Sequence, residues 1–154
     1  MTGMRGRVPS WYISTEVIRK NPLKWREVEA VYLPFNVNDN HWVMICIDFV
    51  EGEIVVWDSL MAITPDASLE EQLNVMRAVI PPLLHKSQAI TVRPNLPMTP
   101  WRISRVTSTP QQFGSGDCGI FCVKYFEYDV TGTSLETLRQ NNMSYFRRQF
   151  AFRL

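Results

Sequence analysis

Three runs of β-branched and aromatic residues follow one another in the first half of the chain, and they constrain the fold more than any other feature. The runs are AVYLPFNV, HWVMICIDF and EIVVWDSL, which begin at residues 30, 41 and 53. The segments between them, NDN and EG, are typical turn sequences. Because connections this short join antiparallel neighbours, we expect three consecutive antiparallel strands.

A helix is predicted after the third strand. Ser68 and Glu71 form a capping box at the start of LEEQLNVMRAVI, in which the apolar residues share one face. Pro81 and Pro82 follow directly, and proline inside a helix removes a hydrogen bond and clashes with the preceding turn. We therefore expect the helix to end at the double proline.

The last third of the chain predicts one more strand and two helices. WRISRVT at 101–107 alternates as a strand does, and CGIFCVKYFEYDV has the spacing and length of a helix with Asp117 as its N-cap. Thr133 and Glu136 form a second capping box, which predicts a final helix over TGTSLETLRQ. The class is α+β. Residues 1–29 carry no sustained pattern, so we divide the chain into a weakly determined segment, 1–29, and one domain, 30–154.

Composition and charge limit the partners and the location that are expected for this chain. The chain of 154 residues is 45% hydrophobic, and its net charge of +1 comes from scattered Lys and Arg. We therefore expect neither nucleic acid nor membrane as partner. We also expect a monomer. The start has no apolar signal region, and the longest apolar run, Trp42 to Ile47, is too short to span a bilayer. A soluble intracellular protein is predicted.

Three cysteines and two histidines limit the chemistry further. Their spacing fits neither a disulfide framework nor a zinc site, so we expect no metal and no cofactor. Cys118 follows the loop GSGD and opens a predicted helix, where free N–H groups and the helix dipole favour a thiolate. Gly119 leaves space beside that thiol. Cys46 and Cys122 lie among apolar residues and are assigned to the core.

His41 and Asp58 are predicted to meet at one end of the sheet. His41 begins the second strand and Asp58 ends the third, so a hairpin places both on one face. A turn at Val50–Glu51 makes them diagonal neighbours, about 7–8 Å apart in backbone terms. A turn at Glu51–Gly52 lengthens the gap, and the sequence leaves both registers open. In either case an acid is positioned to orient a histidine base.

Gln112, six residues before Cys118, completes the set. Its amide is suited to donate to the oxyanion of an acyl-transfer intermediate, with the Cys118 backbone N–H as the second donor. Each residue also has a structural interpretation: a packed core histidine for His41, a turn cap for Asp58, a solvated loop amide for Gln112 and a buried thiol for Cys118. We favour the chemical interpretation because the four roles occur together.

The stretches NHWVMICID, VWDSL and PQQFGSGDCGIFCVKY resemble the ubiquitin-like-protein proteases, also called sentrin or SUMO-specific proteases. The resemblance covers roughly residues 30 to 128 and implies a papain-like fold with an antiparallel sheet and the nucleophile at a helix N-terminus. By this resemblance His41, Asp58 and Cys118 form a triad with Gln112 as oxyanion residue. Trp42 becomes one wall of a tunnel for a Gly-Gly tail, and the substrate a SUMO-type modifier or its conjugates.

The chain differs from the family upstream of the first strand. Family domains usually begin with further helices and a second tunnel tryptophan, which neither Trp11 nor Trp25 matches clearly, so the front is expected to be shortened. Two alternatives stay open: a deneddylase or acyltransferase with the same triad, and a degenerate, non-catalytic modifier-binding module, which a transposon origin would explain. The nucleus is the expected compartment.

Overall fold

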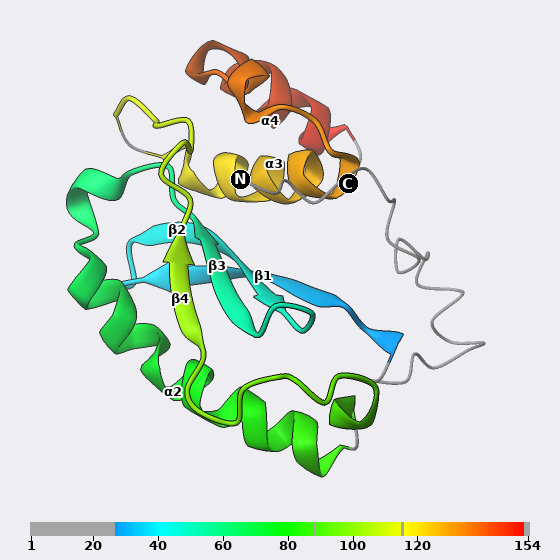
Figure 1. Ribbon diagram of the computed structural model, residues 1–154. Coiled ribbons are helices and arrows are strands. Elements are labelled where there is room, and N and C mark those ends of the chain that lie inside the picture. The colour runs from blue at the N-terminus through cyan, green and yellow to red at the C-terminus, as the bar shows by residue number, and fades with distance from the viewer. Residues whose placement is uncertain (1–26, 88, 115, 153–154) are drawn as a thin grey trace.

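A four-stranded sheet lies between helices on its two faces (Figure 1). The computed structural model describes residues 27–87, 89–114 and 116–152, so the predictions for Trp11 and Trp25 lie outside the described residues. The elements that build the layers are β1 (Ala30–Val37), β2 (His41–Asp48), β3 (Glu53–Trp57), α2 (Asp66–Lys86), β4 (Arg102–Arg105), α3 (Cys118–Thr131) and α4 (Met143–Ala151). The helix α3 covers one face, with α4 packed on its outer side, and α2 covers the other face (Figure 1).

The three predicted strands form an antiparallel meander in the order β1-β2-β3. The turn between β1 and β2 is NDN, in which Asn38 and Asp39 have positive φ angles of 53° and 58°. Asn and Asp tolerate this left-handed conformation better than other residues with a side chain, which explains why they occur here.

The β2–β3 hairpin selects the first of the two registers that the sequence left open. Asp48 pairs with Glu53 and Met44 with Trp57, the register that a Val50–Glu51 turn centre requires. The Asp48 carboxylate accepts hydrogen bonds from the N–H groups of Val50 (2.7 Å) and Glu51 (2.9 Å), so the turn is fixed locally. This register brings the end of β3 beside the start of β2.

The fourth strand joins the sheet in parallel. β4 pairs with β3, with Glu53 beside Arg102 and Val56 beside Arg105. The helix α2 lies between these strands in the chain, and a crossover of this length returns the chain in the same direction. The sheet is therefore mixed: the predicted antiparallel strands are present, and the strand predicted at 101–107 extends them in the other sense.

The prediction that Pro81 and Pro82 end the first long helix is wrong. The helix α2 runs through both prolines to Lys86. Pro81 has no N–H to donate to the carbonyl of Arg77, and that carbonyl instead accepts the backbone N–H of Trp101 at 3.1 Å. The tertiary partner satisfies the group that the proline leaves without its helical donor.

The start of α2 also differs from the prediction. Its N-cap is Pro65 and no side chain caps it, so Ser68 and Glu71 lie within the helix rather than at its end. Asp66 occupies the first turn, where a negative charge is favoured by the helix dipole. The helix therefore begins earlier than the capping box indicated.

The final helix is likewise displaced along the chain. The helix α3 ends at Thr131, and its C-cap Gly132 has a left-handed φ of 66°, which is typical of a helix stop. TGTSLETLRQ then forms a short 3-10 turn, Leu135–Thr137, capped by Ser134 rather than by Thr133. A second 3-10 turn, Gln140–Asn142, precedes α4. The capping residue Ser134 thus begins a single 3-10 turn, and the helix α4 follows later in the chain.

Two apolar layers hold the sheet. The layer against α2 contains Ile45, Ile54, Leu69 and Leu73, among others. The layer against α3 and α4 contains Met44, Cys46, Trp57, Phe121, Cys122, Tyr125, Leu138, Met143 and Phe146. Cys46 and Cys122 are thus core residues, as predicted. The strand β2 is buried on both faces, which explains its nearly continuous apolar run.

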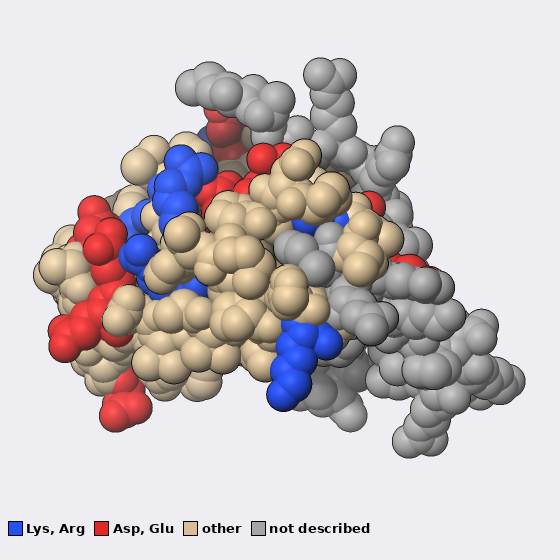
Figure 2. All heavy atoms as spheres, turned by 60° about the horizontal axis from the view of Figure 1, so that its bottom comes forward, with Lys and Arg blue, Asp and Glu red and all other residues tan. Residues whose placement is uncertain are grey.

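The face of the molecule that Figure 2 shows carries no large patch of a single charge. Acidic and basic side chains occur there in small separate groups, and uncharged residues cover most of the area between them (Figure 2). Within the described ranges, no helix combines the length and apolar content that crossing a bilayer requires.

Candidate active site

His41 and Asp58 form a direct buried pair. The Nε2 atom of His41 lies 2.7 Å from Oδ1 of Asp58, and both side chains are almost completely buried. The pairing follows from the hairpin register, because β2 begins at His41 and β3 ends one residue before Asp58. The predicted contact is therefore present.

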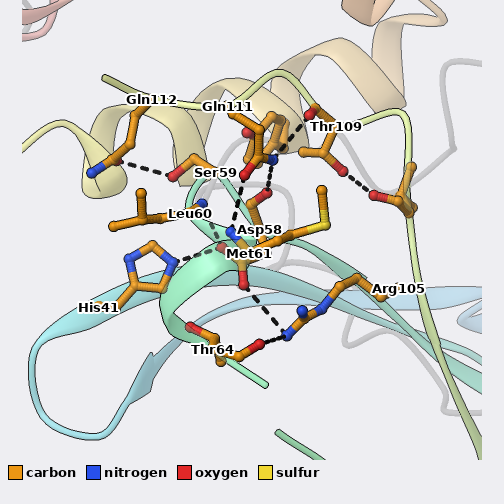
Figure 3. A network of polar contacts seen from close by, with 12 residues as sticks. His41, Asp58, Ser59, Leu60, Met61, Thr64, Arg105, Thr109, Gln111 and Gln112 are labelled. Atoms are coloured by element: carbon orange, nitrogen blue, oxygen red, sulfur yellow. Dashed lines mark hydrogen bonds and ion pairs between the residues drawn. The ribbon is translucent and has the colours of Figure 1, made fainter. Parts of the chain in front are cut away.

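The pair defines the orientation of the imidazole ring. Because Nε2 faces Asp58, Nδ1 lies on the other side of the ring and is the nitrogen directed away from the carboxylate (Figure 3). The backbone N–H of Leu60 donates to the same Asp58 oxygen at 2.7 Å. A carboxylate held at the end of β3 in this way fixes both the ring and its tautomer.

Arg105 contacts the second oxygen of Asp58. Its guanidinium lies 3.5 Å from Oδ2 of Asp58 and 3.1 Å from the carboxylate of Asp66, and it donates to the carbonyl of Thr64 at 2.8 Å. Sequence reasoning missed this residue. Arg105 is brought close to Asp58 by the parallel register of β3 and β4, in which Arg105 pairs with Val56, two residues before Asp58. The guanidinium thus places a positive charge against the buried carboxylate that holds His41.

Gln112 is buried rather than solvated. Its Oε1 atom accepts a hydrogen bond from the Ser59 hydroxyl at 3.1 Å, and its Nε2 donates to the carbonyl of Gly114 at 2.8 Å. Its backbone N–H also donates to the carbonyl of Ser59 at 2.7 Å. Ser59 directly follows Asp58, so the amide is anchored to the residue next to the acid.

Gln111 is a second residue that sequence reasoning missed. Its Nε2 donates to the carbonyl oxygens of Asp58 (2.8 Å) and Thr109 (3.0 Å), and its Oε1 accepts from the N–H of Met61 at 2.9 Å. Figure 3 shows this side chain between the segment after β3 and the loop that carries Gln112. Gln111 thus joins the segment Asp58–Met61 to the segment that carries Thr109 and Gln112.

Cys118 is the first residue of α3, at the positive end of the helix dipole. It is half-buried, whereas Cys46 and Cys122 are fully buried and burial raises the pKa of each of those thiols to about 12. The helix α3 packs against β2, the strand that His41 begins. Among the contacts of the described residues, none is a hydrogen bond between Cys118 and His41, and such bonds often form only with substrate bound.

Two candidate binding residues are accessible. A Cβ at Gly119 would meet no atom within 4 Å, so there is open space beside the thiol. Trp42 is 42% exposed although its neighbours in β2 are buried. In the described part of the chain, no three His, Cys, Asp or Glu side chains gather as metal ligands would.

These features define a class of protein. A histidine paired with a buried carboxylate next to two neighbouring strands, a buried loop glutamine and a cysteine at a helix N-terminus, in an α+β fold, are the parts that a papain-like cysteine peptidase would use. Residues 10–154 match the model of the Ulp1 protease family, C-terminal catalytic domain. The chain belongs to this family.

Curated relatives are similar to the chain over much of its length. It is 28% identical over 125 residues to "Putative ubiquitin-like-specific protease 1B" of Arabidopsis thaliana, a match that covers 81% of the chain and 34% of the relative. It is 27% identical over 117 residues to "Sentrin-specific protease" of Caenorhabditis elegans, covering 74% of the chain and 15% of the relative. The chain thus spans about a third or less of the length of these relatives.

Solved structures share the fold. One is the C-terminal Ulp1 protease domain in complex with Smt3, the yeast orthologue of SUMO, with a TM-score of 0.61, 20% identity and coverage of 85% of this chain and 54% of that one. Another is the SUMO protease Ulp1 with its catalytic cysteine oxidised to a sulfenic acid, with a TM-score of 0.56, 21% identity and coverage of 88% and 57%. These similarities confirm the papain-like α+β fold.

Proposed function

We propose that this chain is a cysteine peptidase that cleaves after the C-terminal glycine of a SUMO-type ubiquitin-like modifier, either in its precursor or in its conjugates. The buried His41–Asp58 pair carries the proposal, because an oriented histidine base is the part of a triad that packing alone does not explain. The family membership and the structure of Ulp1 with Smt3 support a modifier as substrate.

The proposed reaction uses four residues. Cys118 transfers its proton to His41, and its sulfur attacks the glycine carbonyl to form a tetrahedral oxyanion. The Gln112 amide and the Cys118 backbone N–H donate to that oxyanion. His41 then protonates the leaving amine as the C–N bond breaks, and water hydrolyses the resulting thioester with His41 as base. Asp58 stabilises the charged imidazole throughout.

The surroundings of Cys118 suit a tail without side chains. The open space at Gly119 admits a backbone close to the sulfur, and the exposed face of Trp42 offers an apolar wall one residue after the base. Glycine is the residue whose backbone approaches such surfaces most closely. A Gly-Gly terminus is therefore the proposed ligand of Trp42 and Gly119. The proposed location of the protein is the nucleus.

Covalent capture tests the proposal. The purified chain is incubated with SUMO, NEDD8 and ubiquitin that each carry a C-terminal electrophile, and adducts are measured by mass spectrometry. We expect a SUMO adduct that Cys118→Ser abolishes. Cys46→Ser and Cys122→Ser should retain it, because their thiols are buried and protonated.

The other outcomes separate the alternatives. Reaction with the NEDD8 probe alone would make the chain a deneddylase. Binding of a modifier without any adduct would indicate a non-catalytic module. An adduct that persists in Cys118→Ser would remove the nucleophile from the proposal.

A further inference from the structure

The two proposed oxyanion donors lie at opposite ends of one loop. Gln112 precedes this loop and Cys118 follows it, so the distance between the Gln112 amide and the Cys118 N–H depends on the loop's shape. Gly114 and Gly116 both have left-handed φ angles, 87° and 89°. Glycine backbone has the most conformational freedom of any residue, so contacts from outside are needed to hold one shape.

Gln140 supplies such contacts to both ends of the loop. Its Oε1 accepts the backbone N–H of Phe113 at 2.9 Å, directly after Gln112. Its Nε2 donates to Oδ2 of Asp117 at 2.6 Å, directly before Cys118. A single side chain therefore bridges the residues that flank the two proposed donors.

Arg147 holds the end of the loop next to the thiol. Its Nε and Nη2 atoms donate to Oδ1 of Asp117 at 3.0 and 2.7 Å, and Nη2 also donates to the carbonyl of Gly116. Two nitrogens of one guanidinium thus bind a single carboxylate oxygen, a charge-assisted contact stronger than a neutral hydrogen bond. It also balances the negative charge that Asp117 places beside Cys118.

Asp117 consequently does not act as the side-chain N-cap that the sequence predicted. It occupies the N-cap position of α3, but its carboxylate makes no capping hydrogen bond and points instead to Gln140 and Arg147. The carboxylate therefore does not use the N–H groups at the start of the helix, which the proposed oxyanion site needs.

We propose that Gln140 and Arg147 are positioning residues: by holding Phe113 and Asp117, they fix the neighbouring Gln112 and Cys118 in their reactive positions. The inference rests on the proposed function, which it deepens. Arg147 lies on α4, and Met143 and Phe146 anchor this helix in the core. Trp42 and Gly119, the proposed substrate-binding residues, make none of these hydrogen bonds. Replacing Gln140 or Arg147 is therefore expected to lower kcat and to leave KM nearly unchanged.

Steady-state kinetics with a modifier-linked fluorogenic reporter test the proposal on Gln140→Ala, Arg147→Ala and Arg147→Lys. We expect kcat to fall by about 10- to 100-fold in both alanine variants with KM changed by less than about threefold, since small misplacements of reacting groups have effects of this size. Arg147→Lys keeps the positive charge but loses the planar guanidinium with its several N–H donors, so its kcat should lie between those of Arg147→Ala and the unmodified chain. Arg148→Ala, at an exposed neighbouring position on α4, is the control and should behave as the unmodified chain does.

Hydrogen exchange at the Phe113 amide gives a readout that does not depend on turnover. Gln140→Ala should speed this exchange, because the amide loses its acceptor, while Arg148→Ala should not.

Unchanged kcat in Gln140→Ala and Arg147→Ala, a change confined to KM, or unchanged exchange at Phe113 would overturn the proposal. If the unmodified chain does not cleave the reporter, the proposed function fails, and exchange at Phe113 still decides whether Gln140 holds the loop. If Arg147→Ala does not fold, Gln140→Ala and Arg147→Lys decide.

Discussion

Asp58 shows how much a single buried residue depends on its partners. One carboxylate oxygen accepts from His41 and from the N–H of Leu60, and the other faces Arg105 at 3.5 Å. A fully buried carboxylate without such contacts would be protonated rather than charged. Arg105 is therefore as much a part of the acid's environment as His41 is.

Replacing Arg105 with alanine should destabilise the protein and weaken the base. Asp58 would lose its nearest positive charge in a buried site, which costs roughly 1–3 kcal/mol of unfolding free energy. Urea denaturation measures the loss. Arg102→Ala is the matched control on the same strand, because its side chain is 76% exposed and its pair with Glu53 is worth less than about 1 kcal/mol. Equal losses in the two variants would contradict a special role for Arg105.

The β2–β3 hairpin is the element that brings His41 and Asp58 together, and its turn depends on Gly52. This glycine has a φ of 71°, and a Cβ there would lie 2.8 Å from Pro97 Cδ and 3.1 Å from Leu96 Cδ2. Two constraints thus coincide at one residue: left-handed backbone and contact with the segment before β4.

Gly52→Ala should therefore be more destabilising than Gly114→Ala. Both changes place alanine at a positive φ, at a cost of about 1–2 kcal/mol, but only at Gly52 does overpacking add about 1–3 kcal/mol. A Cβ at Gly114 meets nothing within 4 Å. Thermal and urea unfolding of both variants measure the difference. Equal stabilities would mean that the segment containing Pro97 moves aside without cost.

At the scale of the whole molecule, a partly buried polar contact joins the first strand to the helix that begins at Cys118. The Tyr32 hydroxyl on β1 donates to Oδ2 of Asp129 near the end of α3. Burial raises the pKa of the Asp129 carboxyl above its usual 3.8, and the hydrogen bond from Tyr32 opposes that shift. Because the folded state binds this proton more tightly than the unfolded state, folding and protonation are linked.

The sign of this linkage predicts a pH dependence. Asp129 contributes most stability below about pH 4, and the contribution is lost as the pH rises through its raised folded pKa. We expect the stability of the unmodified chain relative to Asp129→Asn to fall over that interval, and urea unfolding at a series of pH values measures it. Glu136→Gln, at an exposed position, is the control. A relative stability that rises with pH, or stays flat, would contradict the prediction.

The sequence by itself determined the features that depend on neighbours in the chain. Strand alternation and short turns limited the hairpin to two registers and placed His41 and Asp58 on one face. Helical spacing after a glycine-rich loop located Cys118 at the start of α3, and apolar surroundings assigned Cys46 and Cys122 to the core. These patterns are local, so no knowledge of distant segments was needed.

Tertiary structure alone decided the features whose partners lie far away in the chain. The N–H of Trp101 allows α2 to pass through Pro81, the parallel strand β4 brings Arg105 to Asp58, and α4 draws Asp117 away from helix capping. In each case a polar group contacts a partner that lies far away in the chain and that no local pattern indicates. The contact forms because packing of the core has already fixed the position of the distant partner, so it costs little further conformational entropy.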